Sequence, residues 1–221
     1  MPKVILSTEE LRRLDTKAVK AGFSERVLIE NASSNMCCLI DSLNLGNKVL
    51  AAAGRGNNGA DTLACARKLA NRGYNVYAIV ISDKEVNKEC SFQADMLKRL
   101  GIHIGFVKDD YGLLRVKELL HKVDFVVDGI LGIGVKKGVE GLLKNAIDII
   151  NAGGKKIVSC DVPSGLNPDT GAVTTSAIRA GYTVTFLSYK KGFFTGKGKN
   201  YCGKIYVADI GVSRELLEKL T

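Results

Sequence analysis

The chain has 221 residues, of which 46% are hydrophobic and 25% are charged, and its formal net charge is +9. These values fit one globular domain over residues 1–221 and exclude disordered, collagen-like and low-complexity classes. No apolar run reaches the roughly 20 residues of a membrane helix and the first residues lack a signal peptide's apolar core, so we expect a cytoplasmic protein that contacts no membrane.

Two helices are predicted ahead of the first long strand. The first spans residues 7–20, because Ser7 and Glu10 have the spacing of a capping box. The second spans residues 24–43 and ends before Gly46. The side chains expected to face the core are Leu11, Leu14 and Val19 on the first helix and Val27, Leu28, Ala32, Met36, Leu39 and Ile40 on the second.

From residue 48 onward, short apolar strands alternate with helices. This alternation predicts right-handed βαβ units, and therefore a parallel sheet that is covered by helices on both faces. Strands are expected at residues 48–54, 75–81, 103–107, 124–128, 156–160, 182–186 and 204–208. Helices are expected at residues 58–71, 86–100, 112–121, 142–151 and 214–220.

The loop after the strand at 48–54 carries glycines in G-x-G-x-x-G spacing. Gly54, Gly56 and Gly59 would let backbone amides and a helix N-terminus approach a phosphate. Asn57 and Asn58 lie in the same loop, either as turn formers or as amide groups for a ligand or an ion.

Two later loops begin with an aspartate at the end of an apolar strand. Asp128 precedes a glycine-rich stretch, and Asp161 is followed closely by Ser164. Because the carboxyl ends of parallel strands meet at one edge of a sheet, we expect Asn58, Asp128, Asp161 and Ser164 to converge on one crevice. Their hard oxygens suit a hard cation, and their low total charge favours a monovalent one.

The cysteines and histidines indicate no other chemistry. None of the six cysteines forms a C-x-x-C pair and several lie in apolar runs, which favours buried, reduced thiols over disulfides or zinc. His103 and His121 lie outside the three loops and are expected to be structural or exposed. The glycine loop has no Walker lysine and the chain has no G-x-S-x-G elbow, which speaks against a P-loop ATPase or a serine hydrolase.

Five motifs, in order, resemble those of the NAD(P)H-hydrate epimerase family, also known as the YjeF N-terminal domain or apolipoprotein A-I-binding-protein family. They are VLIENAS, GRGNNGAD, VVDGILGIGV, DVPSGL and TVTFLSYKKGFFTGKG. They resemble the family's V-L-M-E-N-A-G, G-x-G-N-N-G-G-D, V-D-A-L-F-G-T-G-L, D-I-P-S-G-L and T-V-T-F-x-x-x-K-P-G-L-L-x-G. The resemblance covers almost the whole chain.

The resemblance implies a three-layer Rossmann-like α/β fold, with a central, mostly parallel sheet and helices on both faces, in a protein that is commonly a homodimer. It implies interconversion of the R and S epimers of NADHX and NADPHX, the hydrated forms of the reduced cofactors. It further implies a potassium ion held by Asn58, Asp128 and Ser164. The residues implied to contact the substrate are Asn57, Asn58, Gly59, Ala60, Asp61, Gly132, Ile133, Gly134, Val135, Lys136, Lys137, Gly138 and Asp161, with those at 132–138 around the phosphates.

The chemistry of epimerisation narrows the choice of catalytic residues. The C6 hydroxyl must leave, and water must return on the other face. A carboxylic acid can protonate the leaving hydroxyl and, once ionised, activate the returning water. We expect Asp161 to be this catalytic acid–base, and Lys190 to be its catalytic partner, either orienting Asp161 or contacting phosphate.

Several positions depart from the family pattern. Ala60 and Thr62 replace glycines, Lys191 replaces a proline and Ser33 replaces the last glycine of the first motif. A methyl group at Ala60 would crowd the approach of a phosphate. The acids and amides remain, so we expect activity. The family's domain also resembles the front half of fusions with an ADP- or ATP-dependent dehydratase, and this chain stops before such a domain, so a separate dehydratase is an expected partner.

Two other functions stay open at this point. The net charge of +9 suits an anionic ligand, and the same fold resembles the RNA-linked dimerisation module of enhancer-of-decapping scaffolds. We consider nucleic acid a less favoured ligand than a phosphate-bearing small molecule. A NAD-dependent oxidoreductase would use the glycine loop, with Asp83 as its ribose-binding acid, but no hydride-site constellation accompanies them.

Overall fold

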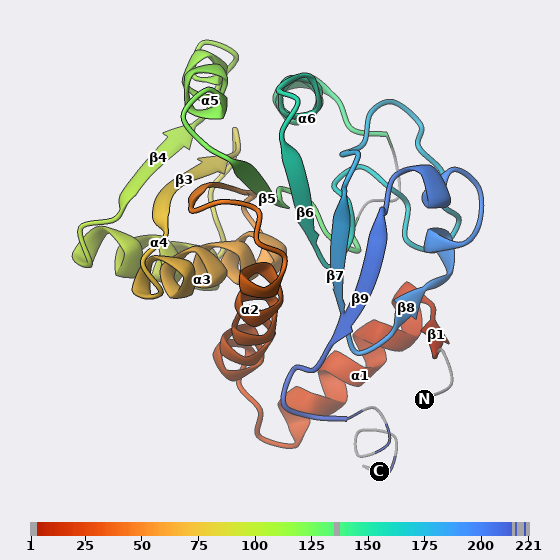
Figure 1. Cartoon of the computed structure of the whole chain (residues 1–221). Coiled ribbons are helices and arrows are strands. Elements are labelled where there is room, and N and C mark those ends of the chain that lie inside the picture. Colours follow the sequence, from red (N-terminus) through yellow and green to blue (C-terminus); the bar gives the residue numbers. More distant parts are fainter. Residues whose placement is uncertain (1–3, 135–137, 214, 216–218, 220–221) are drawn as a thin grey trace.

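A computed structural model describes residues 4–134, 138–213, 215 and 219 of the chain. Its centre is a seven-stranded sheet in the order β4-β3-β2-β5-β6-β7-β9, and each neighbouring pair is parallel (Figure 1). The strands are β2 (Lys48–Ala53), β3 (Asn75–Ile81), β4 (His103–Val107), β5 (Phe125–Gly129), β6 (Lys156–Cys160), β7 (Tyr182–Phe186) and β9 (Lys204–Ala208). The predicted parallel α/β sheet is thereby confirmed.

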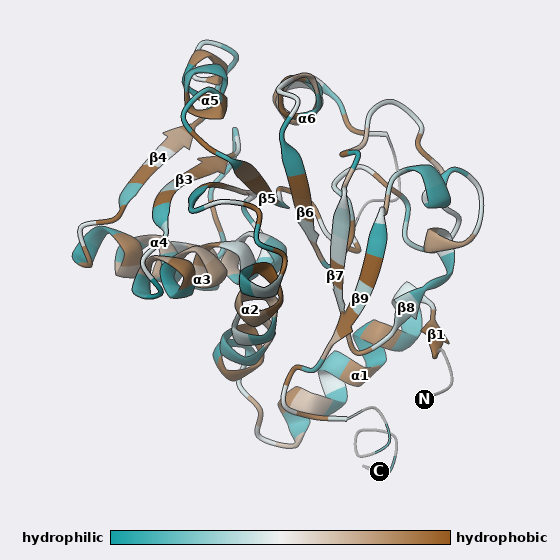
Figure 2. Ribbon diagram, viewed as in Figure 1, coloured by the Kyte–Doolittle hydropathy of each residue, from teal (hydrophilic) through white to brown (hydrophobic). Residues whose placement is uncertain are grey.

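Helices cover both faces of this sheet. One face packs against α2 (Glu25–Ser42), α3 (Asn57–Asn71) and α4 (Lys88–Arg99), and the other packs against α5 (Leu113–Leu120) and α6 (Gly141–Ala152). Successive strand residues alternate between the two cores: Val49 and Ala51 belong to the first, and Leu50 and Ala52 to the second. Figure 2 shows hydrophobic residues concentrated along the central strands.

The N-terminal helices begin where their caps predict. In α1 (Thr8–Lys20), the Ser7 side chain accepts from the Glu10 amide and the Glu10 carboxylate accepts from the Ser7 amide, so the capping box forms. The expected core positions Val19 and Val27 are wrong, because these side chains are 50% and 45% exposed. Ala18 and Ile29 are buried instead, since the helices turn a neighbouring residue toward the sheet.

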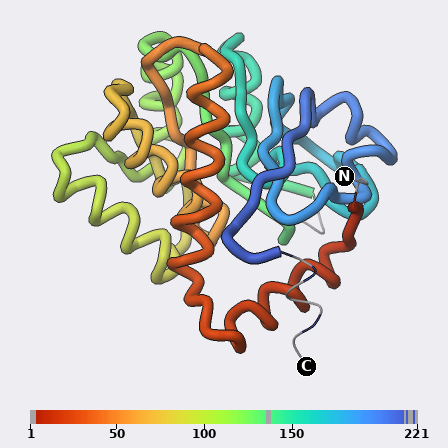
Figure 3. The backbone as a smooth tube through the Cα atoms, turned by 60° about the horizontal axis from the view of Figure 1, so that its bottom comes forward, coloured from red at the N-terminus to blue at the C-terminus, as the bar shows by residue number. Residues whose placement is uncertain are grey.

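A short two-stranded ribbon was not predicted from the sequence. Strand β1 (Ile5–Leu6) pairs in parallel with β8 (Tyr189–Lys190), so that Leu6 lies opposite Lys190. The backbone amide and hydroxyl of Thr8 then donate to the carboxylate of Asp169, at 2.8 and 2.6 Å. These contacts place α1 across the end of the sheet at which β9 terminates (Figures 1 and 3).

The segment between β8 and β9 contains two short 3₁₀ turns, η1 (Lys191–Phe193) and η2 (Gly198–Asn200). The helix expected at 214–220 falls almost wholly outside the described residues. Within the described part of the chain, none of the helices combines the length and apolarity that crossing a bilayer requires.

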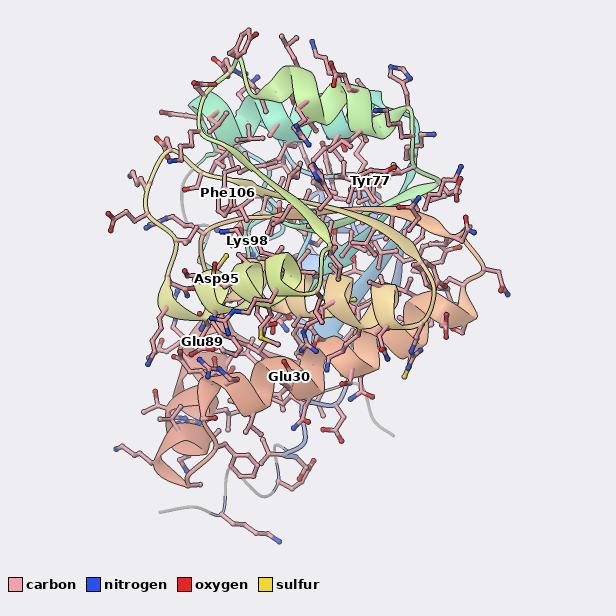
Figure 4. All side chains as sticks on the ribbon, turned by 90° about the vertical axis from the view of Figure 1, so that its left-hand side faces the viewer. Glu30, Tyr77, Glu89, Asp95, Lys98 and Phe106 are labelled. Carbon is pink, nitrogen blue, oxygen red and sulfur yellow. The ribbon has the colours of Figure 1, made fainter. Side chains whose placement is uncertain are left out.

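The outer surface of α2, α3 and α4 carries ion pairs between helices (Figure 4). Glu30 of α2 binds Arg67 and Lys68 of α3, and Arg26 of α2 pairs with Glu89 of α4 at 3.0 Å. These opposite charges pair across the helix contacts and support the packing of α2 against α3 and α4.

Two glycines of the first loop have opposite surroundings. A Cβ added to Gly54 would lie 1.8 Å from the Ile130 carbonyl oxygen, because the loops after β2 and β5 touch there. A Cβ added to Gly56 would meet no atom within 4 Å. Gly54 therefore permits packing between two loops, whereas Gly56 faces open space.

This contrast gives a matched pair of variants. Gly54→Ala should lower the free energy of unfolding by about 1–3 kcal/mol or more, because the loops must separate to admit the methyl group. Gly56→Ala should change it by less than about 1 kcal/mol. Urea denaturation of both variants beside the wild type measures the difference, and equal losses would contradict the close contact at Gly54.

Candidate active site

A cleft of about 1240 Å³ lies at the carboxyl ends of the central strands. The loops after β2, β5 and β6 form one side of it, and one face of α1 forms another wall. Typical small-molecule pockets measure about 300–1,000 Å³, so this one has room for an extended ligand such as a dinucleotide. Lining residues that the sequence predicted are Asn57, Asn58, Asp61, Gly132, Ile133, Gly134, Gly138 and Asp161.

Asp161 is anchored at the end of β6 by a buried lysine. Lys190, 1% exposed, places its Nζ 2.5 Å from the Asp161 Oδ1 atom. The same Nζ donates to the Thr185 hydroxyl at 2.6 Å and to the Phe186 carbonyl at 3.0 Å. An ammonium has three donors, so these partners saturate it. This geometry favours the alternative in which Lys190 orients Asp161 over the one in which it contacts phosphate.

The carboxylate of Asp161 is held by one oxygen only. In the described part of the chain, Thr185, Phe186 and Lys190 all donate to Oδ1, and no hydrogen bond to Oδ2 is present. Asp161 also has φ +60°, in the left-handed region that non-glycine residues rarely adopt. A strained residue with a fixed Oδ1 and an available Oδ2 beside a cleft is suited to proton transfer.

Asp128 and Ser164 lie behind the cleft wall, fully buried. Asp128 Oδ1 accepts from the Ser164 hydroxyl at 2.6 Å and from the Ile130 amide at 3.3 Å, and Oδ2 accepts from the Ser159 hydroxyl at 2.8 Å and from the Ser164 amide at 3.0 Å. Burial raises the pKa of Asp128, while the hydrogen bonds from Ser164 lower it in part.

Leu131 joins this buried pair to the cleft. Its backbone amide donates to the Ser164 hydroxyl and its carbonyl accepts from the Asn58 side chain, both at 2.8 Å. The expectation that Asn58, Asp128, Asp161 and Ser164 all open onto one crevice is thus corrected. Asn58 and Asp161 line it, whereas Asp128 and Ser164 support its wall from inside.

Some of the remaining predicted positions are buried, and others line the cleft. Gly59 and Ala60 are buried at the start of α3, and Ala60 packs into the core, so its methyl group does not crowd the cleft. Asn57 lines the cleft and its side-chain oxygen accepts from Asn87, the N-cap of α4, at 2.5 Å. Val135, Lys136 and Lys137 fall outside the described residues.

The structure also places Asp83, the two histidines and the six cysteines. Asp83 is exposed and is not among the residues that line the cleft, so the ribose-binding role is not supported. His103 and His121 are exposed. All six cysteines are free thiols, five of them buried and only Cys38 exposed. Across the described residues, no group of three His, Cys, Asp or Glu side chains is placed to hold a metal ion.

Among the described residues, four further carboxyl groups line the cleft with Asp161, those of Asp15, Glu25, Asp61 and Glu140. Asp61 of α3 has a pKa raised well above its ordinary value by burial, by the charge of Asp161 and by that of Asp15. Asp15 of α1 is exposed to solvent in the cleft. Partial desolvation by the cleft walls and the charge of Asp161 raise its pKa, with Lys190 acting in the opposite direction. Asp15 was not predicted as a site residue, because the sequence pattern of a helix does not separate a site aspartate from an ordinary solvated one.

Comparison with known proteins is consistent with this architecture. The family model described as YjeF-related protein N-terminus matches residues 25–192. A protein named NAD(P)H-hydrate epimerase from Elusimicrobium minutum is 33% identical over 97% of this chain and 99% of its own length. Its counterpart from Lentilactobacillus buchneri is 36% identical over 95% of both chains.

Two other matches extend the comparison. A protein named bifunctional NAD(P)H-hydrate repair enzyme Nnr, from Thermofilum pendens, is 34% identical over 97% of this chain, but the match spans only 41% of that longer protein. The crystal structure of the yeast protein ynu0 superposes with a TM-score of 0.83 at 22% identity, covering 98% of this chain and 93% of the yeast chain. The likeness to the yeast protein supports the fold.

Replacing Asp128 with asparagine should destabilise the fold. Each carboxylate oxygen accepts from one backbone amide, so the NH₂ group of an asparagine would face an N–H in either orientation. The expected loss is about 1–3 kcal/mol in the free energy of unfolding. Exposed Asp83→Asn is the control and should stay within about 0.5 kcal/mol of the wild type. Equal unfolding midpoints for the two variants would show that the buried network does not contribute to the stability of the fold.

Proposed function

The chain belongs to the family of YjeF-related protein N-termini, and we propose from this membership that it interconverts the R and S epimers of NADHX and NADPHX. One observation carries the proposal: a carboxylate, Asp161, is held through one oxygen by a buried lysine while it lines a cleft large enough for a dinucleotide. The names of the full-length relatives favour this epimerase activity over a non-catalytic RNA-binding module.

The reaction assigns a task to each oxygen of Asp161. The enamine nitrogen of the hydrated ring supplies the electron pair that expels the C6 hydroxyl, which leaves an iminium cation. Protonated Asp161 gives its proton to the departing hydroxyl, and its anion then stabilises the cation and activates water on its own side of the ring. Lys190 positions the group throughout, because its ammonium holds Oδ1 while Oδ2 reacts.

The rest of the dinucleotide would extend along the strand ends. Gly132, Gly134 and Gly138 line the cleft and allow backbone amides to approach phosphates. We propose that the segment 132–138, including Val135, Lys136 and Lys137, surrounds the diphosphate. Gly56 borders open space beside Asn57, which suits the approach of the substrate to the start of α3.

The buried network fits a potassium ion by its donor chemistry. Ser164 contacts both the Asp128 carboxylate and the Leu131 carbonyl, and the Asn58 side chain contacts the same carbonyl. Hard oxygens with one negative charge suit a monovalent cation. When bound, the cation would supply positive charge beneath the phosphates. The chain's own groups already tie the loops after β2, β5 and β6 together through Leu131.

Two partners complete the proposal. The chain spans about two fifths of the length of the bifunctional relatives it matches. We propose that a separate ADP- or ATP-dependent dehydratase consumes the S epimer that this protein supplies. We also propose that the protein works as a cytoplasmic homodimer, which light scattering of the purified protein would test.

A coupled assay tests the activity. A dehydratase specific for the S epimer should consume only part of a mixed NADHX pool by itself and all of it when this protein is added. Asp161→Asn should slow the completion about 10²–10⁴-fold, the usual contribution of a general acid–base. Partial consumption with the wild-type protein would refute the function.

That variant leaves Lys190 buried without its charge partner, which costs stability. The double variant Asp161→Asn/Lys190→Met removes both charges and serves as a second test. Circular dichroism confirms that each variant is folded. A folded variant with the wild-type rate would refute the role of Asp161.

Potassium binding is testable without activity. Potassium chloride should raise the thermal unfolding midpoint above that in choline chloride at equal ionic strength, since a ligand at 10–100 times its Kd stabilises the native state by about 1–3 kcal/mol. Asn58→Leu should abolish the potassium-specific rise, and Asn57→Ala should keep it. An identical midpoint in both salts would contradict the site.

A further inference from the structure

We infer that Asp15 is a second catalytic acid–base, which serves the face of the substrate ring opposite to the face that Asp161 serves. The inference rests on the proposed epimerase function and adds a residue to its mechanism. It assigns a chemical role to α1, whose residues precede the segment 25–192 that the family model matches.

Stereochemistry requires groups on both faces of the ring. Inversion at C6 means that the hydroxyl leaves from one face of the flat iminium ring and that water returns to the other. Asp161 is held at Oδ1 by three donors, so it cannot swing from one side of a bound ring to the other. A second proton-transfer group on another wall removes this difficulty.

The fold brings Asp15 to such a wall. Pairing of Leu6 with Lys190 starts α1 beside the lysine that holds Asp161. The helix then passes across the strand ends (Figure 3), and its successive turns present Arg12, Asp15 and Val19 to the cleft. Asp15 and Asp161 therefore line the same cleft from different elements, a helix on one side and the end of β6 on the other.

Asp15 is exposed to solvent where it lines the cleft, next to several charged groups. Partial desolvation by the cleft walls and the charges of Asp161 and Glu25 raise its pKa, while the charge of Lys190 lowers it. A raised pKa favours the protonated form of Asp15, which is the form that a general acid needs.

The chemical balance is simple. The protonated carboxyl on one wall gives its proton to the C6 hydroxyl, the C6–O bond breaks with its electron pair leaving on water, and the ring nitrogen forms the C6=N bond. Water from the other wall then attacks C6, the C=N pair returns to nitrogen, and the ionised carboxyl on that wall takes the proton. Each direction of the reaction starts from the opposite protonation state, and exchange with solvent resets the pair.

Labelled water separates the two faces. Each pure epimer of NADHX is incubated in H₂¹⁸O with the wild-type protein, Asp15→Asn and the control Glu9→Gln. The control changes an exposed carboxyl of the same helix that does not line the cleft. Chiral separation and mass spectrometry then measure inversion and ¹⁸O uptake at C6, after subtraction of the uncatalysed rate. Thermal unfolding confirms that the variants are folded.

We expect Asp15→Asn to slow inversion about 10²–10⁴-fold in both directions. For one epimer only, it should still incorporate ¹⁸O with retention, because Asp161 can expel the hydroxyl and return water on its own face. Glu9→Gln should invert both epimers at the wild-type rate.

Three results would overturn the assignment of Asp15. They are wild-type inversion by Asp15→Asn, equal loss of inversion and exchange for both epimers, and the expected pattern in Asp61→Asn instead of Asp15→Asn. If the wild-type protein itself fails to invert either epimer, the proposed function falls and the inference falls with it.

Discussion

The buried ion pair of Lys190 and Asp161 is the interaction on which the rest of the site depends. Burying an ammonium costs several kcal/mol unless its donors are satisfied, and Lys190 meets this demand with Asp161, Thr185 and Phe186. The pair links the end of β6 to β7 and β8. The strand that carries Lys190 also pairs with β1, directly before α1. The charge pair thus holds the reactive carboxylate next to the segment from which α1 starts.

Two aspartates that follow the same sequence pattern occupy different environments in the fold. Asp128 and Asp161 each come at the end of an apolar strand, but Asp128 lies inside β5, between β2 and β6, where loops cover it. Asp161 lies one residue beyond β6, and its left-handed backbone sets it beside the cleft. The first therefore organises loops, and the second is available for chemistry.

The glycine loop shows a similar division between packing and binding. Gly54 is needed because the loop after β5 passes within contact distance, whereas Gly56 borders free space beside the start of α3. The G-x-G-x-x-G spacing is thus partly a requirement of loop packing in a parallel sheet. This reading explains how the loop tolerates Ala60, since that residue faces the core and leaves the cleft side unchanged.

Local sequence determined the elements and the chemical types at the strand ends. The capping box at Ser7, the alternation of strands with helices and the family motifs predicted the sheet, and they identified Asn58 and Asp161 as cleft residues. These features depend on near neighbours in the chain, so periodicity and spacing reveal them. Only the tertiary structure decided that Asp128 and Ser164 are buried, that Lys190 is saturated by partners and that Asp15 belongs to the cleft. Those outcomes depend on contacts between residues that are distant in sequence, such as Leu6 with Lys190, and no local pattern encodes them.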